Sequence, residues 1–227
     1  MSNVRTALSL SSPFPYLLFE SAMRADKNQQ VYIVGDDTDI RQALEMLFQT
    51  NNIPATSFEN TATCLTALTP ESNGCMILDI QMPGTSGLAL QKTLNENNFN
   101  VEIIFISGVS DVAIAVEAMK GGALEFLQKP FSDKQLLTCV YQALEINYQK
   151  MQKRRSKEAI EHRIGSLSKR EYEVMNRMLN GDITKVIAAD LGISPRTAEI
   201  HRHNVMEKMQ VKTLAQLVHL VLKARYV

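Results

Sequence analysis

Four polar residues are candidates for chemistry, because each lies within two positions of the end of a strand-length apolar run. They are Asp36, Asp79, Ser107 and Lys129. Parallel strands of an open α/β sheet bring their carboxyl ends to one edge, where such proteins place their reactive groups. We therefore expect the four side chains to converge on one pocket. The preceding apolar runs are Val31–Val34, Cys75–Leu78, Val101–Ile106 and Leu124–Leu127.

The types of these side chains match what the acceptance of a phosphoryl group requires. Asp79 supplies a nucleophilic carboxylate, while Asp36 and Asp37 supply acidic groups for a divalent cation. Ser107 adds a hydroxyl and Lys129 an ammonium group. Each signal is weak when it is taken singly, since an aspartate after a strand is more often a helix cap. Their joint order along the chain supports the interpretation.

The elements that must position these residues follow from the apolar periodicity. Between residues 29 and 147, strand-length runs alternate with helical spacing, and five strands alternating with five helices predict an α/β fold with a doubly wound parallel sheet. After residue 165 the period stays near 3.6, which predicts a small all-α domain of four helices. The predicted parts are a flexible N-terminal extension (1–28), the α/β domain (29–147), a helical linker (148–165) and the all-α domain (166–227).

The composition is that of a globular protein, with 227 residues of which 45% are hydrophobic and 21% charged. No stretch reaches the roughly 18 apolar residues of a membrane span, so no membrane partner is expected. The three cysteines, Cys64, Cys75 and Cys139, lie in apolar contexts without metal-binding spacing. An odd number of cysteines in such positions is typical of reduced thiols and predicts a cytoplasmic protein.

The formal net charge of zero hides an asymmetry between the two halves of the chain. Residues 30–147 carry a net charge of −9, whereas residues 148–165 and 166–227 each carry +4. An acidic half joined to a basic half indicates different partners, a cation for the first and a polyanion for the second. Ordinary charge variation is the alternative explanation, and a charge of +4 would not establish nucleic-acid binding by itself.

Sequence motifs in the second half predict where its helices begin and end. Ser168 and Glu171 have the spacing of a capping box, in which each side chain binds an amide of the other residue. Ser194-Pro195 starts a later helix, since proline fits the first helical turn. Gly192 permits a tight turn after a helix over Thr184–Leu191. Two helices joined in this way are typical of a helix-turn-helix, whose second helix enters the major groove of DNA.

With these motifs in this order, residues 30–147 resemble the receiver domain of a two-component response regulator. Residues 166–227 resemble the LuxR-type helix-turn-helix domain of the FixJ/NarL class. The resemblance implies a flavodoxin-like receiver followed by a four-helix DNA-binding domain. It also implies a transcription regulator and not an enzyme, with at most self-phosphorylation and self-dephosphorylation.

Position by position, the resemblance implies that Asp79 is phosphorylated by a partner sensor histidine kinase. Asp36, Asp79 and the backbone carbonyl of Gln81 match the positions that hold Mg²⁺, which offsets the repulsion between the carboxylate and the phosphoryl oxygens. Ser107 and Lys129 match the hydroxyl and ammonium groups that contact the phosphoryl group. The Lys129-Pro130 peptide matches one that is cis in the family.

The resemblance also implies how the signal leaves the pocket. Phe126 matches an aromatic switch that turns inward after Ser107 moves. The neighbouring face is then expected to form a homodimer, with Val116 as an apolar contact and Lys120 with Glu125 as a cross-dimer ion pair. The dimer would place two DNA-binding domains on adjacent half-sites of double-stranded promoter DNA. The family leans to activation, and RNA polymerase is a further candidate partner.

The helix-turn-helix is expected to present two kinds of side chain to DNA. Cationic and hydroxyl groups suit the phosphate backbone and make affinity depend on salt. These residues are Lys185, Ser194, Arg196, Thr197, Arg202 and Lys208. Glu199, Ile200 and His203 are candidates for base edges, because a carboxylate accepts from cytosine and an apolar side chain contacts the thymine methyl group.

Gly35 departs from the family pattern, in which two adjacent acids follow the first strand. An ungapped alignment through Val34 and Arg41 puts Gly35 at the first acid and Asp36 at the second. Asp37 does not replace the missing acid, because neighbouring side chains point differently. Weaker Mg²⁺ binding is therefore expected. Two functions stay open, a phosphorylation-switched regulator and a DNA-binding dimer that works without phosphorylation.

Overall fold

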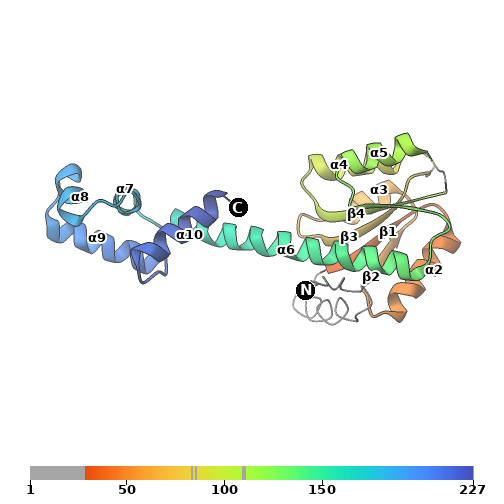
Figure 1. The fold of residues 1–227 in the computed structure, drawn as a ribbon, viewed down its shortest axis with the longest axis horizontal. Helices are drawn as coiled ribbons and strands as arrows, with labels where there is room; N and C mark the ends of the chain where they lie inside the picture. Colours follow the sequence, from red (N-terminus) through yellow and green to blue (C-terminus); the bar gives the residue numbers. More distant parts are fainter. Residues whose placement is uncertain (1–28, 83, 85, 109–110, 227) are drawn as a thin grey trace, which may run out of the picture. The chain divides into compact units, whose positions relative to one another are not determined.

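The strands form where the sequence has its apolar runs. The computed structural model describes residues 29–82, 84, 86–108 and 111–226, and the predicted extension (1–28) lies outside them. The strands are β1 (Gln29–Val34), β2 (Ala55–Phe58), β3 (Asn73–Asp79), β4 (Asn100–Ser107) and β5 (Glu125–Gln128). They are parallel and lie in the order β2-β1-β3-β4-β5 (Figure 1), which confirms the predicted doubly wound sheet.

Helices follow the strands and begin at capping side chains. They are α2 (Thr38–Thr50), α3 (Thr61–Ala67), α4 (Gly87–Glu96), α5 (Val112–Lys120) and α6 (Asp133–Gly165). The caps of the first four are Asp37, Asn60, Ser86 and Asp111. Each cap accepts a hydrogen bond from an amide that the first helical turn leaves unpaired. Ser132 does the same before α6, where its Oγ accepts from Gln135 N at 3.2 Å.

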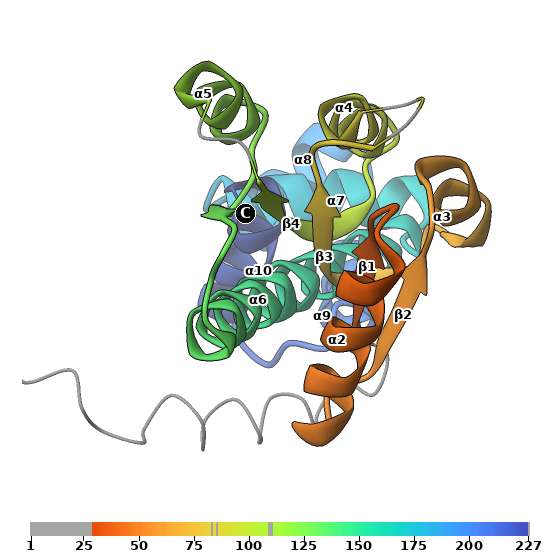
Figure 2. The same cartoon turned by 90° about the vertical axis from the view of Figure 1, so that its right-hand side faces the viewer.

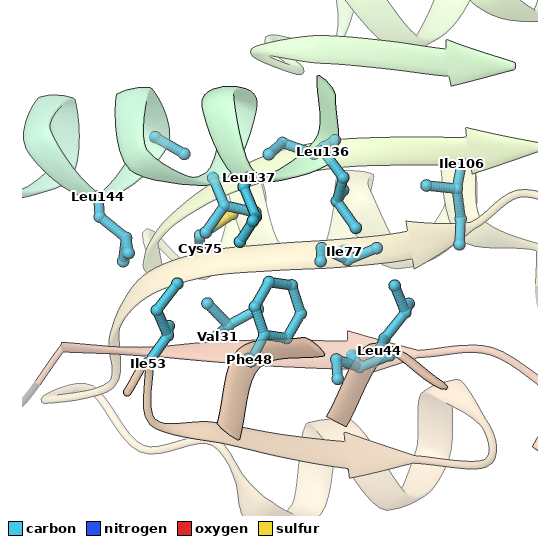
Figure 3. Packing of buried hydrophobic residues seen from close by; sticks show 14 of the residues in the cluster. Val31, Leu44, Phe48, Ile53, Cys75, Ile77, Ile106, Leu136, Leu137 and Leu144 are labelled. Carbon is cyan, nitrogen blue, oxygen red and sulfur yellow. The ribbon is translucent and has the colours of Figure 1, made fainter. Parts of the chain in front are cut away.

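The two faces of the sheet have separate hydrophobic cores, because successive side chains of a strand point to opposite faces. Val31 and Ile33 of β1 pack on the face that α2 and α6 cover, while Tyr32 and Val34 pack on the face of α3, α4 and α5. Figure 2 shows these two layers of helices on either side of the sheet. In Figure 3, Phe48 of α2 lies beside Val31, and residues of α6 point to the same face.

The cysteines belong to these cores and are free thiols. Cys64 and Cys75 are buried, and Cys139 is partly buried. Burial raises the pKa of the Cys64 thiol to about 12 and raises the pKa of Cys75 and Cys139 as well. Since the thiolate is the reactive form, these cysteines are poor nucleophiles at neutral pH. This agrees with the expectation of reduced, structural cysteines.

Helix α6 continues without a break from the sheet through the whole of the predicted linker. Its first turns pack on the sheet through Leu136, Val140 and Leu144. The chain divides into two compact units, and the division falls between Lys150 and Met151 within this helix. In the described part of the chain, no helix combines the length and the apolar composition needed to cross a bilayer.

The second compact unit is helical. After the end of α6 it contains α7 (Lys169–Leu179), α8 (Thr184–Leu191), α9 (Pro195–Lys208) and α10 (Leu214–Tyr226). Its core consists of residues with at most 2% exposure. They are Val174, Met175, Met178, Ile187, Val205, Met209, Leu217 and Val221. Every helix after α6 contributes to this core, so the helix-turn-helix pair is held by α7 and α10.

A buried carboxylate ties α7 to α9. Glu171 closes the predicted capping box, because its Oε2 accepts from Ser168 N at 2.8 Å while Ser168 Oγ accepts from Glu171 N. Lys208 Nζ lies 2.6 Å from the same Oε2 atom. These hydrogen bonds from Lys208 and Ser168 lower the pKa of Glu171 from its usual 4.5 to about 2. The ion pair therefore fastens the end of the predicted DNA-reading helix to the start of α7.

Replacing Glu171 with glutamine is expected to destabilise the helical unit by about 2 kcal/mol at pH 7, because a buried charge-assisted pair is lost. A lowered native pKa gives stability that is fully present above the unfolded pKa and is lost as the pH falls through the native pKa. The difference between variant and wild type should therefore shrink as the pH falls from about 4.5 toward 2. Hydrogen exchange of the α7 amides in both proteins, at pH 7 and pH 3, measures it. A difference that is the same at both pH values would contradict this account.

Candidate functional site

Asp79 is the last residue of β3 and lies at the carboxyl edge of the sheet. Its side chain is 8% exposed, so the carboxylate is largely shielded but not closed off from solvent. One oxygen, Oδ1, accepts from Gln81 N at 3.0 Å. The other, Oδ2, accepts from Lys129 Nζ at 2.6 Å. The Asp79 carboxylate is therefore held in a fixed orientation, with the ammonium group of Lys129 on one of its oxygens.

Lys129 reaches Asp79 because the ends of β3, β4 and β5 lie side by side. The register places Asp79 opposite Ile106 and Ser107 opposite Gln128. Lys129 N donates to the carbonyl of Ser107 at 2.7 Å, which brings the lysine across the end of β4. The Lys129-Pro130 peptide is cis, as predicted. Ser107 itself is buried, with 1% exposure.

The loop between β1 and α2 supplies further acidic residues near the end of β3. Val34 pairs with Leu78, so Gly35 is the neighbour of Asp79, and a Cβ atom on Gly35 would lie 3.6 Å from that of Asp79. Asp36 is exposed, and its carboxylate forms no hydrogen bond or ion pair within the described residues. Asp37, in contrast, caps α2 by accepting from two amides of that helix.

Two neighbours hold this loop in place, and one of them was missed by reasoning from the sequence. Gly35 N donates to the Phe58 carbonyl at 3.2 Å. Arg41 Nη1 donates to the Gly35 carbonyl at 2.6 Å, and Arg41 Nη2 donates to Thr38 Oγ1 at 3.1 Å. The position of Arg41 four residues after Asp37, about one helical turn, is the signal that could have identified it.

The residues present form a partial donor set for Mg²⁺. Two carboxylates, from Asp36 and Asp79, and the backbone carbonyl of Gln81 are oxygen ligands of the kind this cation prefers, and Mg²⁺ commonly keeps several waters besides one or two carboxylates. No group of three acidic, histidine or cysteine side chains with metal-binding geometry occurs among the described residues. The oxygen donors of Asp36, Asp79 and Gln81 fit Mg²⁺ in their chemical type, with one carboxylate fewer than an acid at position 35 would supply.

Gly87, at the start of α4, is a second residue that the sequence did not identify as part of the site. A Cβ atom here would lie 2.5 Å from the Asp79 carbonyl and 3.1 Å from both Leu78 and Phe105. A side chain would therefore push α4 away from the end of β3. The sequence alone did not identify Gly87, because a close approach between distant segments leaves no local pattern.

The face predicted to form the homodimer lies on α5 and β5. Phe126 is half-buried and packs against the core under α5, next to the strand end that leads to Lys129. Val116 is 45% exposed, although its side chain is apolar. Lys120 and Glu125 are exposed at the end of α5 and the start of β5. The structure therefore presents all the predicted dimer residues at the surface of the receiver.

The helix-turn-helix is built by α8 and α9. Gly192 ends α8 in the left-handed conformation, with a φ of 64°, which favours glycine. Ser194 caps α9 by accepting from Thr197 N at 3.0 Å, and Pro195 occupies its first turn, as predicted. Thr184 of α8 donates to the Glu199 carboxylate of α9, which fixes the two helices against each other.

The predicted DNA-contacting residues differ in exposure and in whether their side chains already have a partner. Lys185, Ser194, Arg196, Ile200 and His203 are exposed. Thr197 and Arg202 are half-buried, and the Nη1 atom of Arg202 is buried without a hydrogen-bond partner among the described residues. Glu199 is bound by Thr184, and Lys208 by Glu171. Any contact of Glu199 or Lys208 with DNA would therefore involve a side chain that already has a partner.

These two sites define the class of the protein. A doubly wound sheet with a carboxylate, a lysine and a serine at its edge, joined to a helix-turn-helix unit, is the architecture of a DNA-binding response regulator. Two family models match, the response regulator receiver domain over residues 31–141 and the bacterial regulatory proteins of the luxR family over residues 165–221. The chain belongs to this family of response regulators, in agreement with the resemblance seen in the sequence.

Curated relatives match this chain over most of its length. The chain is 39% identical over 194 residues to the transcriptional regulatory protein FixJ of Azorhizobium caulinodans, which covers 86% of this chain and 92% of that protein. It is 36% identical to nodulation protein W of Bradyrhizobium diazoefficiens, over 84% of each chain. It is also 36% identical to the response regulator protein TodT of Pseudomonas putida, over 86% of each chain.

Solved structures agree with these relatives. A low-resolution structure of the response regulator StyR matches 86% of this chain and 99% of that chain, with a TM-score of 0.82 and 39% identity. Full-length FixJ from B. japonicum matches 88% of this chain and 98% of that chain, with a TM-score of 0.52 and 35% identity. Membership implies a sensor kinase partner for the receiver, DNA binding by the second domain and Mg²⁺ for phosphorylation. It does not place the chain in a known enzyme class.

Proposed function

We propose that the protein is a transcription regulator switched by phosphorylation of Asp79. The observation that supports this most directly is the 2.6 Å contact between Lys129 Nζ and Asp79 Oδ2 at the edge of the sheet. Asp36 is exposed after the end of β1, and Ser107 is buried at the end of β4. A nucleophile, a cation site, a hydroxyl and an ammonium group thus come from four separate strand ends, as phosphoryl transfer requires.

The transfer uses groups that are already in place. One carboxylate oxygen of Asp79 attacks the phosphorus of a phosphohistidine on the sensor kinase. The P–N bond breaks as the P–O bond forms, and its electron pair stays on the imidazole nitrogen. The Lys129 ammonium group contacts Asp79 Oδ2. After the transfer it can bind a phosphoryl oxygen in place of the carboxylate. Mg²⁺ held by Asp36, Asp79 and the Gln81 carbonyl would offset the negative charge that accumulates.

Phosphorylation would then change the α5–β5 face. The Ser107 hydroxyl would turn to the phosphoryl group, and Phe126, which is already half-buried under α5, would move into the space beside it. The face that carries Val116, Lys120 and Glu125 would pair with the same face of a second copy. A homodimer places two helix-turn-helix units on one duplex, which converts weak binding into avid binding. Activation through contact with RNA polymerase, and slow self-dephosphorylation, complete the proposed cycle.

Acetyl phosphate with Mg²⁺ is expected to convert the monomer into a dimer, as measured by size-exclusion chromatography with light scattering. Val116→Asp should keep the phosphorylated protein monomeric, because it places a charge in an apolar contact that is 45% exposed in the monomer. Met46→Asp is the matched control, because Met46 is apolar and 71% exposed but lies on α2. A dimer that forms in Val116→Asp as readily as in wild type would contradict the proposed face.

We expect the replacement of a cationic residue and that of an apolar residue on α9 to change DNA binding in different ways. Arg196→Ala should weaken binding to all sequences and reduce the slope of log affinity against log salt by about 1, because one phosphate contact is lost. Ile200→Ala should leave that slope unchanged and relax sequence preference. Arg170→Ala is the control, since Arg170 pairs with Glu173 on α7. Fluorescence anisotropy across a salt series measures the slopes, and an unchanged slope for Arg196→Ala would remove it from the interface.

A second function is favoured by Gly35, which leaves the cation site with one acid fewer. Under it, the protein would be a DNA-binding dimer that works without phosphorylation. The two functions differ in one measurement, the affinity for a DNA duplex before and after treatment with acetyl phosphate and Mg²⁺. An affinity that rises with phosphoryl incorporation supports the switch. A constant affinity and a constant mass support the alternative.

A further inference from the structure

A cluster of polar side chains lies at the amino-terminal ends of the receiver strands, whereas Asp79 lies at a carboxyl-terminal end. Gln29 begins β1, Asn100 begins β4, and both lie beside the last receiver turns of α6, where Asn147 and Lys150 are found. Gln29 is 2% exposed and Asn147 is 1% exposed. Burying an amide side chain costs free energy unless the amide is hydrogen-bonded. The hydrogen bonds of these two side chains therefore show what they attach.

The amides connect three elements through directional bonds. Gln29 Nε2 donates to the Leu144 carbonyl at 2.9 Å and to Asn147 Oδ1 at 3.0 Å. Asn147 Nδ2 donates to the Asn100 carbonyl at 2.7 Å. One side chain of α6 is therefore bound to the first residues of both β1 and β4. Apolar packing alone would hold the helix on the sheet but would tolerate sliding along its axis, whereas these bonds specify one position.

An ion pair extends the attachment by one helical turn. Lys150 Nζ lies 2.8 and 2.9 Å from the two carboxylate oxygens of Glu102, the third residue of β4. The Glu102 side chain is 10% exposed and that of Lys150 is 64% exposed. The carboxylate thus gains its charged partner from a lysine that approaches from solvent. The first compact unit of the chain ends at this lysine, although the helix itself continues to Gly165.

We propose that Gln29, Asn147, Glu102 and Lys150 form a clasp that fixes where α6 leaves the receiver and couples β1 and β4 to the linker. The two strands lead directly to the phosphorylation site, since β4 ends at Ser107 and β1 ends one residue before Gly35. A small shift of either strand is then carried to the last receiver turn of α6. This regulatory role rests on the proposed phosphorylation switch, whereas the attachment itself does not.

The test compares full-length variants that open the clasp at its two ends. Lys150→Met and Glu102→Gln remove the ion pair, and Asn147→Leu removes the two hydrogen bonds of the Asn147 side chain at similar volume. Glu102→Lys with Lys150→Glu reverses the pair and should restore its effect. Glu158→Gln is the control, because it breaks the exposed pair of Glu158 with Arg154, two turns further along α6.

Three measurements separate attachment from regulation. Hydrogen exchange of amides 146–152 should rise about tenfold in the opened variants and return in the reversed pair. Phosphoryl incorporation from acetyl phosphate and Mg²⁺ should be unchanged. The ratio of DNA affinities with and without phosphorylation should fall about threefold or more, which is a modest coupling energy. The probe is a duplex that the acetyl phosphate-treated wild type selects from random-sequence DNA.

The outcomes decide between the parts of the proposal. Unchanged exchange at 146–152 in all three opened variants would overturn the clasp as an attachment. Faster exchange with an unchanged affinity ratio would overturn its regulatory role. A wild-type affinity ratio of one would instead overturn the phosphorylation switch, and with it the regulatory role, while the exchange measurement would still decide the attachment.

Discussion

Replacement of Asp79 with asparagine should abolish phosphoryl incorporation from acetyl phosphate and from a sensor kinase, and should leave the protein monomeric. An amide oxygen is a far weaker nucleophile than a carboxylate. The amide keeps the shape of the side chain, and its oxygen can still accept from Gln81 N, which lies 3.0 Å from Oδ1. The variant loses the negative charge that Lys129 neutralises. The proposed Mg²⁺ site also loses one of its two carboxylates.

Phosphate-affinity electrophoresis with mass spectrometry of the intact protein measures the incorporation, and light scattering measures the dimer. Asp39→Asn is the matched control, because Asp39 is an exposed acid in the first turn of α2 and the change in charge is the same. That control should be phosphorylated like wild type. If Asp79→Asn still incorporated one phosphoryl group, or still dimerised and activated a promoter, the proposed switch would be wrong.

Replacement of Gly35 with aspartate should strengthen Mg²⁺ binding about tenfold, since a third carboxylate beside Asp79 adds negative charge close to the cation. The structure has room for a Cβ atom at this position, because it would lie 3.6 Å from that of Asp79, which is ordinary van der Waals contact. The backbone of Gly35 is also outside the left-handed region that would exclude other residues. Without Mg²⁺ the variant should be less stable by about 1 kcal/mol, because two carboxylates would repel each other.

Calorimetric titration with magnesium chloride measures the affinity directly, apart from any phosphorylation rate. Gly35→Asn controls for the size of the side chain without its charge and should leave the affinity close to that of wild type. The Mg²⁺ concentration that gives half-maximal phosphorylation should fall in Gly35→Asp in the same proportion. An affinity equal to that of Gly35→Asn would show that the missing acid does not limit this site.

Much of the fold was determined by local sequence. Strand-length apolar runs placed β1, β3, β4 and β5 to within two residues, because strands of a parallel sheet covered on both faces read as near-continuous apolar runs. The capping residues Ser86, Asp111 and Ser194 were found at the helix starts where their side chains can bind unpaired amides. Asp79 and Lys129 were predicted to meet because strand ends converge at one edge of a parallel sheet, and their contact confirms it.

The partners of individual side chains were decided by tertiary structure. Spacing along the chain did not separate Asp37, which caps α2, from Asp36, which is exposed and forms no hydrogen bond or ion pair with the residues that the structure describes. It did not show that Arg41 holds the loop at Gly35 or that Thr184 binds Glu199. A residue's type determines which bonds it can form, but several acceptors in the chain would satisfy each donor.

The clasp between Glu102 and Lys150 illustrates the physical reason. These residues are separated by 48 positions, and neither has a local pattern that distinguishes it from a solvated surface charge. Their contact depends on the register of β4 and on the distance that α6 has travelled along the sheet, since each helical residue advances about 1.5 Å and each strand residue about 3.3 Å. Local sequence determined which elements form and in what order, whereas the packing of those elements determined which side chains meet.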